Sequence, residues 1–375
     1  MPPCIGIDAS RAISAAPTGT EGYSYHLIRA LLPRLTPRFE VRLYAREAPA
    51  ADTFPNTAEV RVMPWPRLWT HTRLSWEMWR HPPDLLFVPA HVLPLYTPAR
   101  ALVTVHDLGY RYFPDAHPWR QRWYLEWSTR RNVRAAAHVL ADSQATRDAI
   151  VTAYSVPAEK ITVVYPGYDS DLAPVRDLRK QRAARDRYGV PLDKPYVLHL
   201  GRIQPRKNLA RLATAFAYLL PQHPELRLVL AGPAGWMAEP IRARVRDLGL
   251  ERQVIFPGYI DAEDKAALIS AAKFVAYPSL YEGFGFPALE AQACETPLLA
   301  SNTSSLPEVV GEGGLLVDPG DTPALADAMQ RLLEDRALRR QLILRGRENL
   351  ARFDWKITAQ KVASIIEALY QEDLG

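Results

Sequence analysis

Residues 282–290 have the sequence EGFGFPALE and follow a short apolar segment at 274–277. The two glycines predict a tight turn, and Pro287 stands where a helix can begin, because proline is favourable at the first helical position. A strand, a turn and a helix are therefore expected in succession. Free amide groups and the positive end of the helix dipole would face outward there as an anion site. Glu282 and Glu290 flank that site, so the expected ligand carries hydroxyl groups as well as negative charge.

Short β-branched segments alternate with helical patterns on both sides of this stretch. The alternation is typical of α/β units with a parallel sheet. Strands are predicted at residues 4–8, 41–44, 84–88, 102–105, 161–164, 196–200, 226–230, 254–256 and 274–277, and helices at 21–33, 118–136, 143–153, 208–220, 237–248, 262–271 and 287–295. The pattern stops over the polar, arginine-rich residues 171–190 and then restarts. Two Rossmann-like domains explain it most simply.

The chain has 375 residues, more than the roughly 250–300 at which one hydrophobic core stops growing. The first domain is predicted to span residues 1–189 and the second residues 190–355. A final helix, residues 356–375, follows Asp354, which is expected to cap it. Because too few strands remain for a third domain, this helix is expected to cross back onto the first domain.

The composition is that of an ordinary globular protein, with 48% apolar and 23% charged residues. No apolar run approaches the roughly 20 residues that span a bilayer, and the chain opens directly on a strand, so neither an integral membrane protein nor a signal peptide is expected. The two cysteines, Cys4 and Cys294, lie far apart in the sequence. A disulfide framework is not expected, and a reducing cytosol fits.

The net charge of +5 is unevenly distributed. Residues 1–190 hold 25 Lys and Arg against 18 Asp and Glu, whereas residues 191–375 hold 21 against 23. A basic first half favours an acidic partner, such as a phosphate-bearing acceptor or anionic lipid headgroups, with nucleic acid as the third option.

A basic loop, residues 201–208 with the sequence GRIQPRKN, follows the predicted strand at 196–200. Ligands of open α/β sheets bind outside the carboxyl ends of the strands. Arg202 and Lys207 can each donate a charge-assisted hydrogen bond to a diphosphate, worth about 1.5–3 kcal/mol. Asn208 is expected to cap the next helix. Taken alone, a solvated basic loop is the commoner explanation. With the two glutamates further along, a nucleotide sugar is favoured, because it offers both phosphate and hydroxyl groups.

These features together resemble the retaining glycosyltransferases of family four, which have the GT-B architecture. The resemblance rests on the Gly-Arg…Lys-Asn loop and on the two glutamates separated by seven residues. Four further segments stand in the family's order, at residues 141–143, 163–167, 305–308 and 314–317. The resemblance covers essentially the whole chain. It implies two Rossmann-like domains facing a cleft, with the donor held mainly by the second domain and the acceptor mainly by the first.

The resemblance also implies roles for single residues. Arg202 and Lys207 would bind the donor diphosphate, Glu282 the hydroxyls of the donor sugar, and Glu290 the ribose. Further donor contacts are expected from the backbone amides of Gly285 and Phe286, and from Gly258 and Tyr259 beside the nucleobase.

Two positions of the first domain complete the expected site. His106, in the sequence VHDL at residues 105–108, matches the family's His-Asp pair and would reach the donor sugar or the acceptor. A structural histidine is the alternative, and Asp107 is expected to orient the loop. Gly19 belongs to the flexible glycine loop, in which the usual adjacent glycine pair is replaced by Gly19 and Gly22. Gly19 is still expected to let the backbone approach the diphosphate.

The predicted function is transfer of a hexose, with mannose preferred, from GDP-mannose or a UDP-sugar to a glycan or glycolipid acceptor, as in polysaccharide biosynthesis. Retention of configuration and independence of metal and cofactor are expected. The catalytic residues would be Glu282, His106, Arg202 and Lys207. The alternatives are a nucleotide-sugar epimerase and a non-catalytic nucleotide-sugar binding protein. A dinucleotide-dependent dehydrogenase is disfavoured, because the first strand lacks Gly-x-Gly-x-x-Gly.

A basic and aromatic segment at residues 111–134 suggests a second surface. Trp123 and Trp127 lie four residues apart, on one face of the predicted helix at 118–136. One hypothesis is that this helix contacts anionic membrane, where tryptophan and arginine are well suited. The alternative is an amphipathic helix packed on its own sheet. Trp65, Trp69, Trp76 and Trp79 are expected to add aromatic surface. The predicted location is cytoplasmic and peripheral on the inner face of the plasma membrane, with no nucleic-acid partner.

Overall fold

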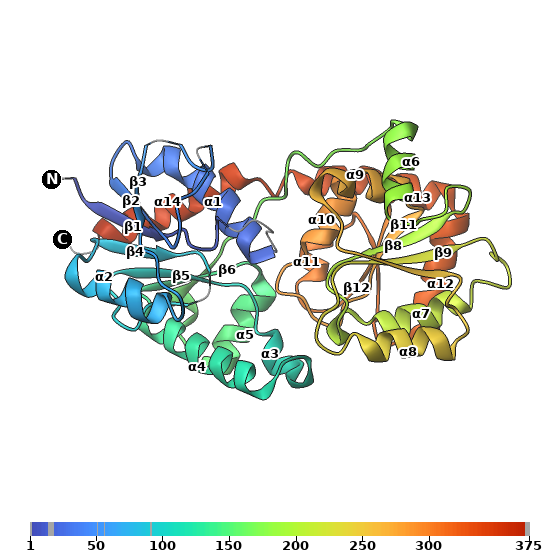
Figure 1. Ribbon diagram of the computed structural model, residues 1–375, viewed down its shortest axis with the longest axis horizontal. Helices are drawn as coiled ribbons and strands as arrows, with labels where there is room; N and C mark the ends of the chain where they lie inside the picture. The colour runs from blue at the N-terminus through green and yellow to red at the C-terminus, as the bar shows by residue number, and fades with distance from the viewer. Residues whose placement is uncertain (1, 14–18, 51, 56, 91, 372–375) are drawn as a thin grey trace. The chain divides into compact units, whose positions relative to one another are not determined.

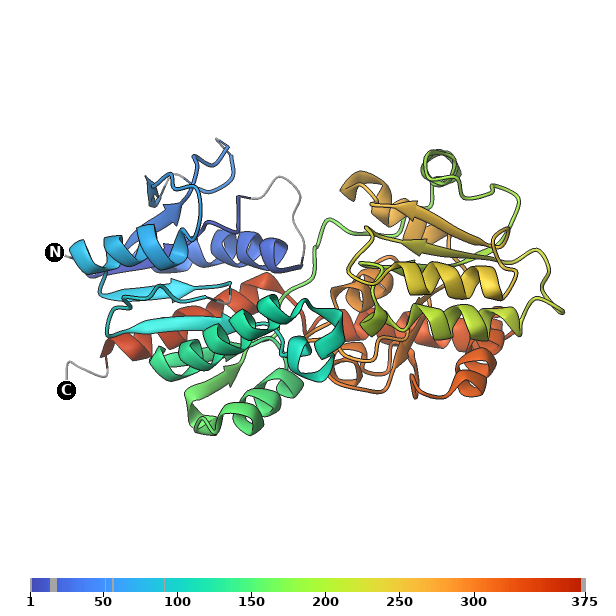
Figure 2. The same cartoon turned by 60° about the horizontal axis from the view of Figure 1, so that its bottom comes forward.

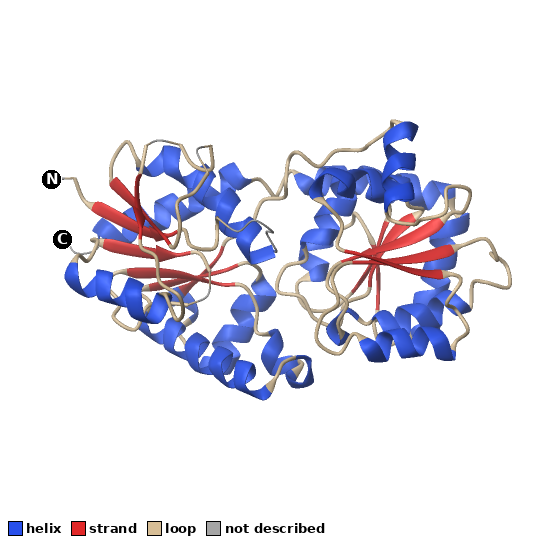
Figure 3. Ribbon diagram, viewed as in Figure 1, coloured by secondary structure: helices blue, strands red, loops and turns tan. Residues whose placement is uncertain are grey.

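The computed structural model describes residues 2–13, 19–50, 52–55, 57–90 and 92–371. Internal contacts divide the chain into two units. The first unit comprises Met1–Arg111, Trp119–Gly167 and Phe353–Gly375, and the second comprises Tyr112–Pro118 and Tyr168–Arg352. Each unit is a parallel β-sheet covered by helices (Figure 3). The predicted α/β class with two Rossmann-like domains is therefore confirmed.

The first unit contains a seven-stranded parallel sheet in the order β3-β2-β1-β4-β5-β6-β7. Its strands are β1 (Cys4–Asp8), β2 (Glu40–Ala45), β3 (Glu59–Val62), β4 (Leu85–Val88), β5 (Ala101–Val105), β6 (His138–Ala141) and β7 (Ile161–Val163). The sequence did not predict β3 and β6. Strand β3 is a largely exposed edge strand with charged residues in alternation, whereas β6 has four mostly buried residues. The strand order reverses between β1 and β4, which makes a topological switch point.

Helices cover both faces of this sheet (Figures 1 and 2). The helical segments of the first unit are α1 (Gly19–Leu35), η1 (Thr70–Leu74), α2 (Ser75–Arg80), α3 (Gly109–Tyr112), α4 (Trp119–Ala135), α5 (Gln144–Tyr154), η3 (Ala158–Lys160) and α14 (Trp355–Gln371). The short helix η2 (Pro114–Ala116) lies in the segment Tyr112–Pro118, which belongs to the second unit. One core joins strand residues such as Leu86, Val103 and Val139 to α2, α4 and α5. Helices α1 and α14 pack against each other.

The final helix α14 belongs to the first unit, as its predicted return implies. Asp354 caps it, because its Oδ1 accepts a hydrogen bond from the backbone N–H of Lys356 at 2.7 Å. The hydroxyl of Thr358 donates to the carbonyl of Tyr165 at 2.8 Å. Trp355 lies so close to Gly167 that a Cβ atom on this glycine would be 2.3 Å from the Trp355 nitrogen. The two segments that leave the first unit are thus packed against each other.

The second unit contains a six-stranded parallel sheet in the order β10-β9-β8-β11-β12-β13. Its strands are β8 (Tyr196–Leu200), β9 (Arg227–Ala231), β10 (Val254–Gly258), β11 (Phe274–Tyr277), β12 (Leu298–Ser301) and β13 (Leu315–Val317). The sequence did not predict the short strands β12 and β13. Alternate residues of β8 enter different cores, with Val197 on one face of the sheet and Leu198 on the other. The strand order reverses between β8 and β11, which places a switch point there.

Helices also cover both faces of the second sheet (Figure 1). They are α6 (Leu178–Arg187), η4 (Pro205–Lys207), α7 (Leu209–Ala217), α8 (Glu239–Asp247), α9 (Ala262–Ala271), α10 (Phe286–Ala293), α11 (Leu306–Val310), α12 (Thr322–Glu334) and α13 (Arg336–Leu350). Helices α7, α8 and α12 share one core, whereas α6, α9, α10 and α11 share the other.

The boundary between the units differs from the predicted one. The chain enters the second unit at Tyr168, not at residue 190, and leaves it at Arg352. The polar stretch at 171–190 contains α6, which packs against α9. Its only buried residue is Ala184, so the helix has no apolar stripe that the sequence could reveal.

We expect Gly167→Ala to lower the melting temperature of the protein. The added methyl group would meet the backbone and ring of Trp355 at 2.3–2.8 Å, and overpacking of this kind costs about 1–3 kcal/mol. For a unit of this size, that corresponds to a shift of several degrees. Thermal unfolding followed by circular dichroism measures it.

The matched control is Gly22→Ala in α1, where a Cβ atom would meet nothing within 4 Å. That variant is expected to melt at the wild-type temperature or slightly above it, since Ala favours the helix. Equal melting temperatures for both variants would contradict the close packing of Gly167.

Candidate active site

Glycines bring the carboxyl ends of three neighbouring strands close together in the second unit. Gly201, Gly232 and Gly258 follow or end β8, β9 and β10, and their φ angles are +140°, +144° and +83°. A Cβ atom on Gly232 would lie 2.0 Å from the carbonyl oxygen of Gly201. Only glycine fits this approach. The loop after β8 therefore leaves the sheet at the switch point, beside the loop after β11.

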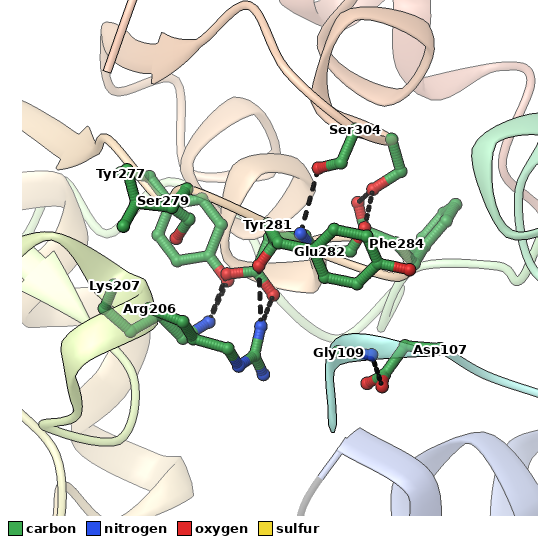
Figure 4. Close-up of polar contacts among 12 residues, drawn as sticks. Asp107, Gly109, Arg206, Lys207, Tyr277, Ser279, Tyr281, Glu282, Phe284 and Ser304 are labelled. Carbon is green, nitrogen blue, oxygen red and sulfur yellow. Dashed lines mark hydrogen bonds and ion pairs between the residues drawn. The ribbon is translucent and has the colours of Figure 1, made fainter. Parts of the chain in front are cut away.

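A buried ionic cluster joins these two loops (Figure 4). Glu282, only 6% exposed, lies in the loop after β11. Its Oε2 accepts a hydrogen bond from Arg206 at 2.8 Å, and its Oε1 accepts one from the ammonium group of Lys207. Lys207 also donates to the hydroxyl of Tyr277 at 2.6 Å. We call Arg206, Lys207 and Glu282 the ionic triad.

The loop after β12 supports the Glu282 loop from the other side. The hydroxyl of Ser304 accepts a hydrogen bond from the Glu282 amide at 2.9 Å (Figure 4). The hydroxyl of Ser305 donates to the carbonyls of Glu282 and Phe284 at 3.0 and 2.7 Å. Gly285 follows at φ +114°, and α10 begins at Phe286 with Pro287 in its first turn. The turn and the helix start that the sequence predicts are thus present. Hydrogen bonds from Ser304 and Ser305 hold the backbone of this loop at Glu282 and Phe284.

The triad sets the charge state of its members. Burial raises the pKa of Glu282, but the Arg206 and Lys207 cations outweigh it and hold that pKa far below its usual range. Burial, together with the charge of Lys207, lowers the pKa of His199 to about 4. The imidazole is therefore neutral at pH 7, with its Nδ1 hydrogen bonded to the carbonyl of Ala276 at 3.0 Å. The cluster consists of two cations, one carboxylate and a neutral histidine.

Arg202 is exposed and stands apart from the triad. It makes no hydrogen bond or ion pair with any residue that the structure describes. Its stem lies against Gly235, where a Cβ atom would be 2.9 Å from the arginine Cγ.

Asn208 does not cap α7 with its side chain, contrary to the prediction. Its amide donates to the carbonyl of Pro319 at 2.8 Å instead, because its backbone is left-handed.

Glu290 lies about one turn into α10, as predicted, and forms an ion pair that the sequence did not reveal. Lys265 of α9 donates to its Oε1 at 2.6 Å. Burial would lower the pKa of Lys265, but Glu290 outweighs it and the pKa is raised. Tyr259, also predicted to contact the donor, is 53% exposed at the end of β10.

His106 lies in the first unit with both ring nitrogens engaged. Nδ1 is 2.5 Å from Asp142 Oδ2, and Nε2 is 2.9 Å from the carbonyl oxygen of Pro89. Since a carbonyl only accepts, Nε2 carries a proton there. Burial lowers the pKa of His106, but Asp142 outweighs it, so the pKa is raised. These two contacts therefore fix the orientation of the His106 ring, and contact with a sugar would require it to exchange one partner.

Two positions of the first unit that the sequence analysis named remain, Asp107 and Gly19. Asp107 accepts a hydrogen bond from the Gly109 amide at 2.8 Å (Figure 4), which confirms that it orients its own loop. Gly19 is the first residue of α1. Pro17 and Thr18, which belong to the predicted glycine loop, lie outside the described residues.

Metal independence stays a prediction. One Asp-x-Asp stretch occurs in the chain, Asp169-Ser170-Asp171, and such a pair is a common means of holding a divalent ion. Here Asp169 Oδ1 accepts a hydrogen bond from the Asp171 amide at 3.1 Å. Within the described ranges, no group of three or more His, Cys, Asp or Glu side chains could hold a metal ion. Both cysteines are free, as expected.

The tryptophans of α4 point outward. Trp119, Trp123 and Trp127 are 70%, 66% and 36% exposed, and the last two rings are parallel with centroids 6.4 Å apart. The buried face of α4 consists of Ser128, Thr129, Asn132 and Val133 instead. Helix α4 therefore packs on its own sheet through this face, as the alternative predicted, and its tryptophans stay outside that contact. Trp69, expected at the surface, is fully buried and donates to the carbonyl of Met63 at 2.7 Å.

No helix within the described part of the chain has both the length and the apolar character to cross a bilayer.

Two family profiles together match most of the chain. The one described as "Glycosyltransferase Family 4" matches residues 17–172, and the one described as "Glycosyl transferases group 1" matches residues 180–349. The "O-antigen chain mannosyltransferase B" of Escherichia coli is 32% identical over 292 residues, which are 77% of this chain and 76% of that protein. The "D-inositol 3-phosphate glycosyltransferase" of Corynebacterium glutamicum (strain R) is 36% identical over 238 residues, which are 61% of this chain and 57% of that protein.

Solved structures share the whole fold. The sucrose-phosphate synthase from Thermosynechococcus elongatus superposes with a TM-score of 0.76 at 26% identity, covering 98% of this chain and 99% of that one. Anabaena HepE, in complex with UDP and glucose, superposes with a TM-score of 0.74 at 23% identity, covering 98% of this chain and 100% of that one. The fold is that of the GT-B enzymes. The chain belongs to the family-four glycosyltransferases, and the protein is a hexosyltransferase.

We expect Glu282→Gln to destabilise the protein most at neutral pH. Removing one member of a buried ion pair costs about 3–5 kcal/mol, because the partner charges stay buried. The pKa of Glu282 is lowered in the folded state. The stability it contributes is therefore fully present above the unfolded-state value near 4.3 and is lost as the pH falls below it.

The melting temperatures of wild type and Glu282→Gln, measured from pH 7 to pH 3, should therefore keep a constant difference down to about pH 4.3 and approach each other below it. Glu251→Gln, at an exposed glutamate, is the control and should follow the wild type throughout. A difference between wild type and Glu282→Gln that stays constant over this range would contradict an ionised, cation-paired Glu282.

Proposed function

We propose that the protein transfers a hexose, with retention of configuration and without a metal ion, from a nucleoside diphosphate sugar to a glycan or glycolipid. The observation that supports this most is the ionic triad at the switch point of the second sheet. It holds a carboxylate, suited to sugar hydroxyls, beside cations suited to a diphosphate. Arg202, exposed on the same loop, adds a further cation.

The proposed reaction depends on electrostatics fixed before the donor binds. The bond between the anomeric carbon and the phosphate oxygen breaks, so negative charge grows on the leaving diphosphate and positive charge on the sugar ring. Arg202, Lys207 and the amino end of α10, including the amides of Gly285 and Phe286, stabilise the leaving group. The acceptor oxygen bonds to the anomeric carbon on the same face, and its proton passes to the leaving phosphate.

The other donor contacts are assigned by position. Glu282 holds hydroxyls of the transferred sugar, and Glu290 accepts hydrogen bonds from the ribose. Gly258 and Tyr259 lie against the nucleobase. In the first unit, Gly19 lets the backbone approach the diphosphate. His106 hydrogen-bonds the sugar or the acceptor after exchanging its contact with Pro89.

GDP-mannose is the preferred donor and UDP-sugars are the second choice. The Escherichia coli relative is named a mannosyltransferase, which supports mannose as the transferred sugar. The Anabaena structure contains UDP and glucose, which supports a UDP-sugar as the second choice. An O-antigen chain is a polysaccharide, which supports a glycan or glycolipid acceptor.

Arg202→Met tests the proposal without disturbing the fold. Because Arg202 makes no hydrogen bond or ion pair with the described residues, its loss should leave the melting temperature unchanged. Loss of one charge-assisted contact in the transition state should slow transfer by about 100-fold or more. GDP-mannose, UDP-glucose and ADP-glucose are screened by thermal shift, and the rate of transfer is measured with the best donor, with and without EDTA.

Arg252→Met, at an exposed arginine of the same unit, is the control and should transfer at the wild-type rate. The anomeric configuration of the product, read by NMR, tests retention. The proposal fails if none of these donors raises the melting temperature, or if the Arg202 variant transfers normally. A sugar altered without any acceptor would identify an epimerase instead.

We further propose that the outer face of α4 contacts anionic membrane. Three exposed tryptophans share this helix with five arginines, of which four are exposed: Arg120, Arg122, Arg130 and Arg134. A hollow of about 460 Å³ beside Trp127 is lined by Arg130, Arg131 and Arg134. Arginine attracts anionic headgroups at roughly 1 kcal/mol per residue, and tryptophan suits the interface. An enzyme with a glycolipid acceptor would meet its substrate there, on the inner face of the plasma membrane.

Flotation with vesicles containing phosphatidylglycerol tests the membrane proposal. The wild type should float at low salt, and the double variant Trp123→Ala/Trp127→Ala should lose most of this binding. Tyr218→Ala, at an exposed aromatic residue of the second unit, should float as the wild type does. Absence of wild-type binding at low salt would refute the proposal.

A further inference from the structure

Lys265 and Glu290 form an ion pair with unused hydrogen-bonding capacity. Lys265 lies in the first turn of α9, Glu290 lies one turn into α10, and the two helices pack against each other. The pair joins Nζ to Oε1 at 2.6 Å, with the side chains 31% and 14% exposed. Among the described residues, neither Glu290 Oε2 nor the other two N–H groups of Lys265 have a hydrogen-bond partner.

The pair lies at the functional edge of the second sheet. Helix α10 leaves that edge directly after the loop that carries Glu282, and α9 begins there shortly after β10. The titratable groups near the pair include Asp169, Tyr259 and Cys294. Tyr259, one of the residues assigned to the nucleobase, is exposed and lies near enough to Lys265 to affect its pKa.

Two explanations compete for this arrangement. A structural pair between helices would engage as many donors and acceptors as possible, because a largely buried charge is costly when it is only partly satisfied. Here one carboxylate oxygen and two ammonium hydrogens are left over. This combination matches a hydroxyl group, which donates to a carboxylate and accepts from an ammonium group at the same time.

We propose that Lys265 acts together with Glu290 as a ribose-binding pair. Lys265 holds one oxygen of the carboxylate and thereby aims the other at a ribose hydroxyl, while its own free N–H donates to the hydroxyl oxygen. Lys265 is therefore a positioning and specificity residue that selects ribonucleotides over deoxyribonucleotides. This inference rests on the proposed nucleoside diphosphate sugar donor and adds a residue to that site.

The test compares nucleotides that differ in one hydroxyl. The probe is GDP or UDP, whichever raises the wild-type melting temperature more, together with its 2′-deoxy and 3′-deoxy forms. Dissociation constants are measured by titration calorimetry for wild type, Lys265→Met, Lys265→Arg and Glu290→Gln. Lys273→Met is the control, since Lys273 is an exposed lysine of the same unit that precedes β11.

The wild type should bind the ribonucleotide at least about tenfold more tightly than one of the deoxy forms, as expected for a charge-assisted hydrogen bond. In Lys265→Met the preference for the ribonucleotide over that deoxy form should fall below about threefold, because only the ribonucleotide binds more weakly. Lys265→Arg should keep most of the preference, and Lys273→Met all of it. Glu290→Gln should lose it as Lys265→Met does.

A merely structural role for Lys265 gives a different result. Lys265→Met would then weaken the ribo and deoxy forms equally, or leave the ratio unchanged, and either outcome overturns the inference while the donor proposal stands. If neither GDP nor UDP binds the wild type and none of the three screened donors raises its melting temperature, the proposed function fails and the inference fails with it.

Discussion

The second unit depends on one interaction, the contact of the buried Glu282 carboxylate with Arg206 and Lys207. A carboxylate that is 6% exposed would cost several kcal/mol without partners. Its partners come from the loop after β8, whereas Glu282 comes from the loop after β11. Because neither the carboxylate nor Lys207 can be buried alone, the two loops are stable only together. The ion contact thereby fixes the geometry of the switch point.

The surrounding backbone makes this contact possible. Gly201 and Gly232 let the ends of β8 and β9 approach closely, so the basic loop leaves the sheet beside β11. Ser304 and Ser305 then fix the loop of Glu282 from the end of β12. Loops from three strands thus hold the charged groups in place without a ligand. A site of this kind need not reorganise when charge develops on a leaving group, which is the condition for effective electrostatic catalysis.

The sequence predicted the features that depend on local pattern. Most of the apolar strands and the turn at residues 282–290 follow from residue types and spacing. Contacts between distant segments could not be predicted in this way. Lys207 and Glu282 are 75 residues apart, and the pairing of Lys265 with Glu290 requires knowing that α9 and α10 are neighbours. Arg206 could have been found, since it adjoins Lys207 in the same basic loop, whereas α6 has too few buried residues to form a pattern.

The charged groups at the two sites differ in number and sign between the two units. In the first unit, one acidic group, Asp142, contacts one basic group, His106, at 2.5 Å. The ionic triad has two cations and one carboxylate, and the exposed Arg202 raises the total to two positive charges. The proposed donor carries two negative charges on its diphosphate. Without Glu282, the buried Lys207 would face the cost of an uncompensated charge whenever the donor is absent. The carboxylate therefore stabilises the empty site, and the exposed Arg202 supplies the charge that only the bound donor neutralises.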